Sequence, residues 1–245
     1  MRRSILLATV VLLVTALAAN VALALGSGPP SDDAYVDINT PSTPHDDDEL
    51  EVRASNTACD PTYIVYLKWD LSDIPDGTSV HTATLTLTTS SASNSSGASI
   101  TLYEAADVYA ATSTPWEEEG LTYSNAPDIA VGTPIETQAA PTAGGQALIF
   151  SSTALRDYVN AQAAGDNVAS FALRFSGGCP TGLTAVVFED RESPVNGPHL
   201  QLLNTNAVRQ HSFQASGLTY QWTVAGMLTI LGLVTIGRFV AKRTE

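Results

Sequence analysis

A run of acidic residues near position 45 offers the oxygen ligands that calcium prefers. His45 is followed directly by Asp46, Asp47, Asp48 and Glu49. Calcium takes about six to eight oxygen ligands, and extracellular sites often bind it with millimolar affinity. The spacing matches no EF-hand loop, so two interpretations stay open: a calcium site at these carboxylates and a solvated acidic loop.

Three aromatic residues are candidates for contact with a sugar, because an aromatic ring face packs well against the apolar face of a sugar ring. They are Trp116, Tyr66 and Tyr123. Trp116 precedes three glutamates in a segment that we predict to be a loop. Packing in the core is the alternative for each of them, and it is the favoured one for Trp116.

Enzymatic chemistry finds little support in the sequence. None of the four histidines has the spacing of a metal ligand, and the G-x-S-x-G nucleophile motif does not occur. Acidic residues are abundant, which leaves a glycosidase carboxylate pair as the enzymatic alternative. We predict that the protein is not an enzyme.

The N-terminal residues 1–24 have the pattern of a secretory signal peptide. Two arginines at positions 2–3 precede an apolar run at 5–14, and small residues follow. Residues 22–24 (Ala-Leu-Ala) fit a cleavage site, and 16–18 fit nearly as well. An uncleaved anchor helix is the alternative.

The C-terminal residues 218–237 are predicted to form a transmembrane helix, because they carry no charge and about 20 apolar residues span a bilayer core of roughly 30 Å. Tyr220 and Trp222 stand where aromatic rings favour the interface. The tail 238–245 is basic, which places the C-terminus in the cytoplasm and the remainder outside the cell membrane. A buried core helix and a cleaved sorting tail are the alternatives.

The part between these ends is strongly acidic. Residues 25–217 hold 24 acidic and 6 basic side chains, a formal charge of 6 − 24 = −18. This charge argues against nucleic acid as a partner, since phosphates require Lys and Arg. It is compatible with a soluble surface domain or with one that collects divalent cations.

The pattern of apolar residues predicts an all-β domain over residues 31–204, followed by a polar linker at 205–217. Residues 80–89 alternate apolar and polar side chains, and 63–71 are rich in β-branched and aromatic residues. Further strands are expected at 34–37, 100–104, 147–150, 169–175, 185–189 and 199–203, with polar loops at 72–77 and 91–97.

One short helix is expected after residue 152. Leu155, Tyr158 and Val159 have helical spacing, Ser151 or Ser152 can cap its start, and Gly165 can end it. Many short strands with one helix indicate an antiparallel β-sandwich, and we predict a jelly-roll-like arrangement.

Cys59 and Cys179 are the only two cysteines in the sequence. Both lie in turn-like sequence, and an even count in an exported chain favours a disulfide between them. Two free thiols are the alternative.

Several segments, in order, resemble one known family, the DNRLRE domain, also classed as carbohydrate-binding module family 96. They include YLKWDLSDIP at 66–75, WEEEGLTYSNAP at 116–127 and FEDRES at 188–193. The other matching segments are 33–37, 83–87, 155–159, 170–174 and 198–200. Tyr123 stands where a Trp is common in the family.

This resemblance implies a β-sandwich of secreted and surface proteins that binds acidic or other polysaccharides in some members, without catalysis. We therefore expect a membrane-anchored surface module that binds an extracellular or envelope polysaccharide. A structural or adhesive surface protein without a specific sugar ligand is the alternative. Arg191, in the charged strand end 189–192, is predicted to pair with a carboxylate rather than with a ligand.

Overall fold

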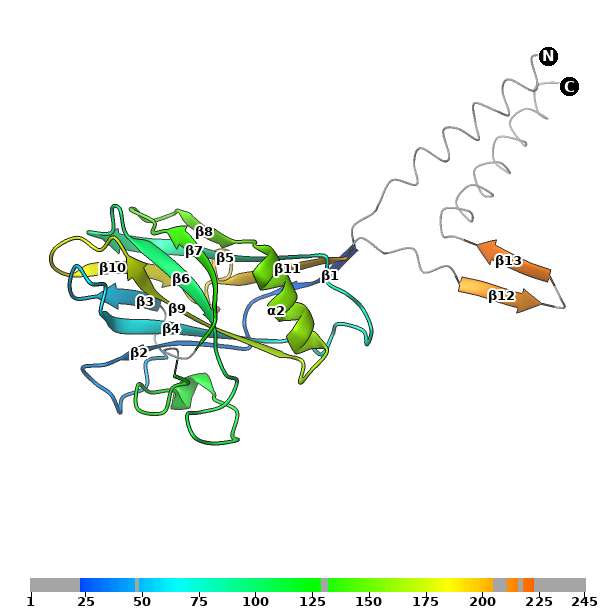
Figure 1. Ribbon diagram of the computed structural model, residues 1–245, viewed down its shortest axis with the longest axis horizontal. Coiled ribbons are helices and arrows are strands. Elements are labelled where there is room, and N and C mark those ends of the chain that lie inside the picture. Colours follow the sequence, from blue (N-terminus) through cyan, green and yellow to red (C-terminus); the bar gives the residue numbers. More distant parts are fainter. Residues whose placement is uncertain (1–22, 47–48, 129–131, 205–210, 216–217, 223–245) are drawn as a thin grey trace, which may run out of the picture. The chain divides into compact units, whose positions relative to one another are not determined.

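The computed structural model describes residues 23–46, 49–128, 132–204, 211–215 and 218–222 (Figure 1). The chain divides into two compact units, one of Ala24–Asn204 and one of Met1–Leu23 with Thr205–Glu245. In the latter unit, the described residues form strands β12 (His211–Ala215) and β13 (Leu218–Trp222), which pair antiparallel.

The larger unit is built almost entirely from antiparallel strands, as the sequence predicts. Its strands are β1 (Leu23–Gly28), β2 (Asp32–Asp37), β3 (Glu49–Ala54), β4 (Pro61–Asp70), β5 (Thr82–Ser93), β6 (Ser99–Glu104), β7 (Pro134–Ala139), β8 (Ala147–Phe150), β9 (Val168–Gly177), β10 (Thr184–Glu189) and β11 (His199–Asn204). The helices are α2 (Thr153–Ala163) and the short 3₁₀ helix η1 (Glu118–Gly120).

Strand β5 belongs to two sheets. Its first half pairs with β11 and β8, and its second half pairs with β10. From β10 the second sheet continues in the order β3, β4, β9, β6 and β7, with β2 also paired to β4. One hydrophobic core contains side chains of both sheets and of α2, so the fold is β-sandwich-like.

The alternation predicted for β5 is confirmed. Ala83, Leu85 and Leu87 are buried, whereas the threonines between them are half-exposed. Side chains on a strand alternate between its two faces, so this pattern buries the leucines and leaves the threonines on the outer face.

Strand β4 is covered on both faces. Val65, Leu67 and Trp69 belong to the main core, whereas Ile64 and Tyr66 belong to a second hydrophobic cluster with Trp116 and Leu121. The second cluster also contains Ala34 and Val36 of β2 and Ala172 of β9. Residues 105–128, which we call the covering segment, therefore close over the outer face of β2, β4 and β9; they form the green loops with the short helix below β2 in Figure 1.

Helix α2 begins where the sequence predicts. Ser152 is its N-cap and accepts a hydrogen bond from the Leu155 amide at 3.2 Å. A carboxylate oxygen of Glu136 accepts the amide hydrogens of Ser151 and Ser152, both at 2.8 Å. A negative charge at this position stabilises the helix, because the N-terminal end of the helix dipole is positive. The helix packs against β5, β7 and β9 through buried Leu155, Tyr158 and Val159.

Three strands of the larger unit, β1, β3 and β7, were not predicted, and β1 begins within the predicted signal peptide 1–24. Strand β3 has a regular period-2 pattern, in which Leu50, Val52 and Ala54 alternate with charged residues. The pattern was overlooked because it directly follows the acidic run 46–49 and shares Glu49 with it. In β7 only Ile135 is buried, so its pattern is weak. The predicted loop 91–97 is also shorter than expected, because β5 continues to Ser93.

The predicted terminal segments are only partly described. Residues 1–22 of the signal peptide lie outside the described residues, as do 223–237 of the membrane helix and the tail 238–245. Residues 218–222 form strand β13 instead of the start of a helix, and 211–215 of the predicted linker form β12. Within the part of the chain that is described, none of the helices has the length and apolar character of a membrane span. The jelly-roll arrangement stays a prediction.

The predicted disulfide between Cys59 and Cys179 is present, with the two Cα atoms 5.4 Å apart. Cys59 lies in the β3–β4 turn and Cys179 in the β9–β10 turn, so the bond joins segments 120 residues apart. At Gly178, φ is +68° and a Cβ atom would lie 2.1 Å from the Gly97 carbonyl oxygen. Glycine is therefore required beside the disulfide, where the backbone also approaches the β5–β6 turn.

Removing the disulfide by the double substitution Cys59→Ser, Cys179→Ser should lower the free energy of unfolding by about 2–4 kcal/mol. The bond restricts the unfolded chain, so wild-type protein unfolded with a reductant present should show the same loss. Urea titrations of the three samples measure it. Equal midpoints for oxidised wild type and the double variant would contradict the stabilising role.

Candidate functional site

Two of the three predicted sugar-binding aromatics are buried. Trp116 is 0% exposed and Tyr66 is 2% exposed, so neither has a ring face that a ligand could contact. The packing alternative is therefore the correct one for both. Tyr123 is 39% exposed and lies in the covering segment. It keeps an accessible ring, and its role in binding stays a prediction.

The two buried rings hold the covering segment in place. The Tyr66 hydroxyl donates to the Pro127 carbonyl at 2.6 Å, and the Trp116 indole Nε1 donates to the Ala106 carbonyl at 3.1 Å. Burial raises the pKa of Tyr66, so this hydroxyl remains a donor at physiological pH. Lys68 of β4 donates to the Trp116 carbonyl, and its Nζ lies 4.5 Å from the centre of the Trp116 ring. Strand β4 thus holds the covering segment at Pro127 and at Trp116, whereas the bond from Trp116 to Ala106 lies within the segment.

Between the covering segment and helix α2 lies an open groove of about 440 Å³, which we call the Tyr109 groove. Its lining consists of residues 104–106, 108–112, 127–128 and 132–133, together with Tyr158 and Gln162 of α2. This volume lies within the usual range for small-molecule sites, roughly 300–1,000 Å³. The hydrogen bonds of Tyr66 and Trp116 reach Pro127 and Ala106, both in the lining.

Tyr109 is a half-buried aromatic residue of the groove and is held at its hydroxyl. The Glu117 amide donates to this oxygen at 3.1 Å, and the hydroxyl donates to the Glu117 carbonyl at 3.3 Å. A Cβ atom at position 120 would lie 2.4 Å from the same oxygen, so Gly120 provides the space for it. The ring is therefore pre-oriented before any ligand binds.

The groove also carries two carboxylates and several hydrogen-bonding groups. Glu104 ends strand β6 and is half-buried, whereas Asp128 is exposed. The Tyr158 hydroxyl in the lining donates to the Ser170 carbonyl at 2.7 Å, and burial raises its pKa. Gln162 lies one helical turn further along α2. Carboxylates, an amide and an aromatic ring in one groove suit a polyhydroxylated ligand, whose hydroxyl groups donate and accept while its ring carbons pack.

Outside the groove, a cluster of ion pairs surrounds Arg191. Its guanidinium contacts Glu118 at 2.9 Å and Glu192 at 2.7 Å, and its backbone amide donates to Asp33 at 2.9 Å. The three carboxylates lie within 4.8 Å of one another, a spacing that would suit a metal ion. Because the guanidinium already binds two of them, the cluster is a clasp between β2, η1 and the β10–β11 loop. The predicted pairing of Arg191 with a carboxylate is confirmed.

Burial of Asp33 has an electrostatic cost. Desolvation raises the pKa of this carboxyl group from 3.8 to about 7, although the Arg191 amide opposes the shift. The guanidinium Nε is 3.9 Å from Asp33 and is shared with the other carboxylates, so it compensates only partly. Desolvation also raises the pKa of Glu118, with Arg191 acting against it. Three carboxylates thus share one cation.

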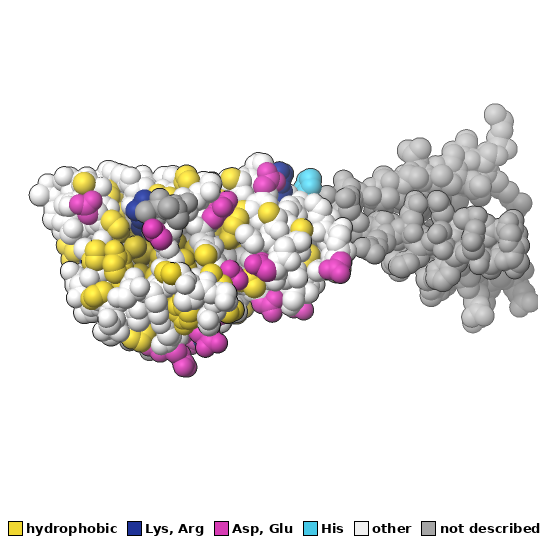
Figure 2. All heavy atoms as spheres, turned by 60° about the horizontal axis from the view of Figure 1, so that its bottom comes forward, with side chains coloured by type: hydrophobic (Ala, Val, Ile, Leu, Met, Phe, Trp, Pro, Cys, Tyr) yellow, Lys and Arg dark blue, Asp and Glu magenta, His cyan; other side chains and the backbone are white. Residues whose placement is uncertain are grey.

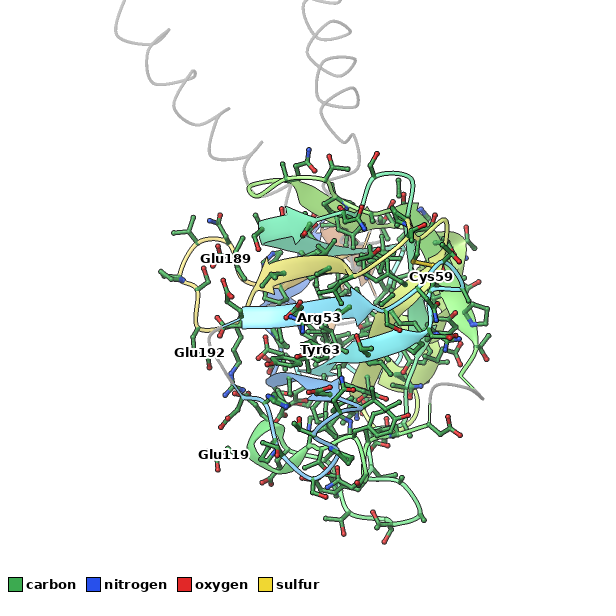
Figure 3. All side chains as sticks on the ribbon, turned by 90° about the vertical axis from the view of Figure 1, so that its left-hand side faces the viewer. Arg53, Cys59, Tyr63, Glu119, Glu189 and Glu192 are labelled. Atoms are coloured by element: carbon green, nitrogen blue, oxygen red, sulfur yellow. A yellow bond between two sulfur atoms is a disulfide. The ribbon has the colours of Figure 1, made fainter. Side chains whose placement is uncertain are left out.

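An aromatic ladder on β2, β3 and β4 has no free tyrosine face. The Tyr35 ring stacks between His45 at 4.6 Å and Tyr63 at 5.1 Å, centre to centre. The Arg53 guanidinium covers the other face of Tyr63 at 3.9 Å and also binds Glu51 (Figure 3). These contacts fill both faces of each tyrosine, so the ladder stabilises the sheet rather than offering a platform.

The predicted calcium site is described only in part. Asp46 and Glu49 are exposed, and Glu49 accepts a hydrogen bond from the Ser90 hydroxyl at 3.0 Å. Asp47 and Asp48 lie outside the described residues. Calcium binding at 46–49 therefore stays a prediction.

Sequence reasoning missed Tyr109, Glu104 and Asp128. One signal pointed to them: the connection between β6 and β7 runs from residue 105 to 133. Connections longer than about 12–15 residues without regular strands or helices of their own are uncommon in compact domains and are often functional. In the described residues of this connection, 105–128 and 132–133, the three-residue helix η1 is the only helix and no strand is present.

Carbohydrate-binding module family 96 matches residues 27–204, from the end of β1 to the end of β11, with the covering segment included. The fold is β-sandwich-like, and the matching family is one of carbohydrate-binding modules. The chain belongs to carbohydrate-binding module family 96, the family also called DNRLRE, as the resemblance predicts. No curated protein matches the sequence.

Replacing Asp33 with Asn should remove a pH dependence of stability. A carboxyl group whose pKa is raised in the fold destabilises it as pH increases from the unfolded value of 3.8 to about 7. Wild-type protein should therefore lose free energy of unfolding over this window, on the order of a few kcal/mol. Asp33→Asn should flatten this part of the curve and be the more stable protein at pH 8.

Urea unfolding between pH 4 and pH 8 measures this effect, since each titration yields a free energy of unfolding. Asp73→Asn, at an exposed position in the 72–77 turn, is the control and should leave the wild-type slope intact. An unchanged slope in Asp33→Asn would show that Asp33 is ionised in the folded protein throughout.

Proposed function

We propose that this protein is a non-catalytic, surface-exposed module that binds a polysaccharide chain in the Tyr109 groove. Membership of a carbohydrate-binding family supports sugar as the ligand. The observation that carries the assignment to the groove is the fixed Tyr109 ring beside Glu104, Asp128 and Gln162. An aromatic face with hydrogen-bonding groups around it matches the two surfaces of a sugar.

The non-catalytic role is supported by the state of the carboxylates. Glycoside hydrolysis requires a carboxylate pair in which one member donates and the other accepts or attacks. Arg191 binds Glu118 and Glu192 of the three-carboxylate cluster, so these two groups are held in ion pairs. Glu104 and Asp128 of the groove are the pair on which the enzymatic alternative would depend. The family description also favours binding over catalysis.

Anchoring at the cell membrane is part of the proposal. It rests on the apolar residues 218–237 followed by a basic tail, and on the signal-like residues 1–24. A disulfide between Cys59 and Cys179 is expected of a protein that folds in an oxidising compartment.

The location has a direct test. We expect residues 31–204 to react with a membrane-impermeant label on intact cells, since the signal exports them. A tag placed after Glu245 should react only after the cells are permeabilised. Labelling of the C-terminal tag on intact cells would reverse the proposed orientation, and protection of the domain would overturn export.

A structural or adhesive role without a sugar ligand is the second candidate. The observation that favours it is the burial of Trp116 and Tyr66, together with the covered faces of Tyr35 and Tyr63. Under this alternative the Arg191 clasp and the aromatic ladder serve only to stiffen a spacer on the surface.

A glycan array probed with the full chain separates the two candidates. We expect binding to at least one polysaccharide, and Tyr109→Ala should weaken that affinity roughly fivefold to tenfold by removing one stacking surface. Gly120→Ala should also weaken binding, because its Cβ displaces the Tyr109 hydroxyl. Circular dichroism and a urea titration confirm that each variant is folded.

Tyr123→Ala is the matched comparison, because Tyr123 is an exposed tyrosine of the same segment outside the groove lining. If Tyr123→Ala abolishes binding and Tyr109→Ala does not, the groove is the wrong site. If no glycan binds above background, with or without calcium, the structural alternative replaces the proposed function.

A further inference from the structure

We infer that the Tyr109 groove selects a polysaccharide bearing protonated amino groups, a polymer of amino sugars. This inference rests on the proposed function and names the chemical class of its ligand. The charges of the whole domain and the groups in the groove support it independently.

The domain offers almost no free positive charge to an acidic ligand. Residues 24–204 contain 24 acidic and 5 basic side chains. Four of the five basic side chains are already bound to carboxylates: Arg53 to Glu51, Lys68 to Asp32, Arg156 to Asp157 and Arg191 to Glu118. Figure 2 shows acidic side chains spread over the face that carries the covering segment, with few basic ones between them.

The fifth basic residue, Arg174, lies outside the groove lining. Its guanidinium sits 4.9 Å from the centre of the Tyr103 ring, and its Nη2 donates to the Tyr103 hydroxyl at 3.4 Å. A polymer of uronic acids would therefore approach a negative surface and find a single cation, already engaged with a ring. Like charges at such a surface repel, and a cationic chain is attracted instead.

The groove repeats this charge pattern locally. Its lining includes Glu104 and Asp128 and contains neither Lys nor Arg. Hydrogen bonds from an ammonium group to a carboxylate are roughly twice as strong as those between neutral groups. Tyr109 adds a ring that attracts cations through its face. An amino sugar presents both complements, an ammonium group and an apolar ring face.

A basic peptide could pair with the two acidic residues of the groove, but it would leave the other polar residues of the lining without hydrogen-bond partners. Its extended side chains lack the ring of hydroxyl groups that polar residues of the lining, such as Gln162 and Thr133, would meet. We therefore commit to an amino-sugar chain, and the peptide is an outcome of the test.

The experiment compares six-unit chains whose repeating units carry a positive charge, no charge or a negative charge, with a cationic peptide as a further comparison. With the full protein immobilised, we measure the affinity for a β-1,4-linked glucosamine hexamer, for its N-acetylated counterpart, for a mannuronate hexamer and for hexalysine. We expect the glucosamine hexamer to bind at least tenfold more tightly than the N-acetylated hexamer, and the mannuronate hexamer not to bind. Added salt should weaken the preference, as should a pH that deprotonates the amines.

Variants assign the effect to the groove. Glu104→Gln and Asp128→Asn should each reduce the affinity for the glucosamine hexamer about fivefold and reduce its preference over the N-acetylated hexamer. Asp76→Asn removes the same charge at an exposed turn outside the groove and should change the affinity less than twofold. Equal effects of all three would show that only the overall charge matters, which would overturn the inference.

The remaining outcomes separate the inference from the proposed function. Equal affinity for both glucosamine chains, or tighter binding of mannuronate, overturns the amino-sugar class and leaves polysaccharide binding in place. Hexalysine binding as tightly as the glucosamine hexamer overturns sugar recognition at this groove. Binding of none of these chains, together with a blank glycan array, overturns both.

Discussion

The covering of strand β4 on its second face is the constraint on which the candidate site depends. An antiparallel sheet usually packs one face on the core and leaves the other in water. Here Ile64 and Tyr66 face a second hydrophobic cluster, and Lys68 binds Asp32 and the Trp116 carbonyl. The segment that supplies this cover also forms one wall of the Tyr109 groove, so a core contact on β4 positions a surface site.

Charge distribution explains why the same domain contains both tight ion pairs and an unbalanced surface. Residues 24–204 hold 24 acidic and 5 basic side chains, and two of the five cations, Lys68 and Arg191, join segments that are distant in sequence. Arg191 joins β2, η1 and the β10–β11 loop, and Lys68 joins β2 to the covering segment. The acidic residues left over face solvent or the groove. The excess of acidic over basic side chains thus explains both why the cations are paired with carboxylates and why the surface is negative.

Much of the fold could be predicted from local patterns. Three local patterns depend only on neighbouring residues, and all are confirmed: the alternation in β5, the helical spacing of Leu155, Tyr158 and Val159, and the Ser152 cap. Strand β7 was missed because it buries only Ile135, which leaves no period to detect. The site was harder to predict, because Trp116 and Tyr66 have the chemistry of sugar-binding residues, and only their burial shows otherwise.

By itself the sequence determined the class of fold, the family, the acidic character and the two cysteines that pair, since composition, periodicity and ordered motifs are properties of the chain. Only the tertiary structure decided which aromatic rings face solvent. Exposure depends on what packs across a strand from positions distant in sequence, as residues 105–128 pack on β4. Tyr109, which no motif marks, lines the groove because Gly120 leaves space for its hydroxyl. Trp116, which a motif does mark, is buried beneath the same segment.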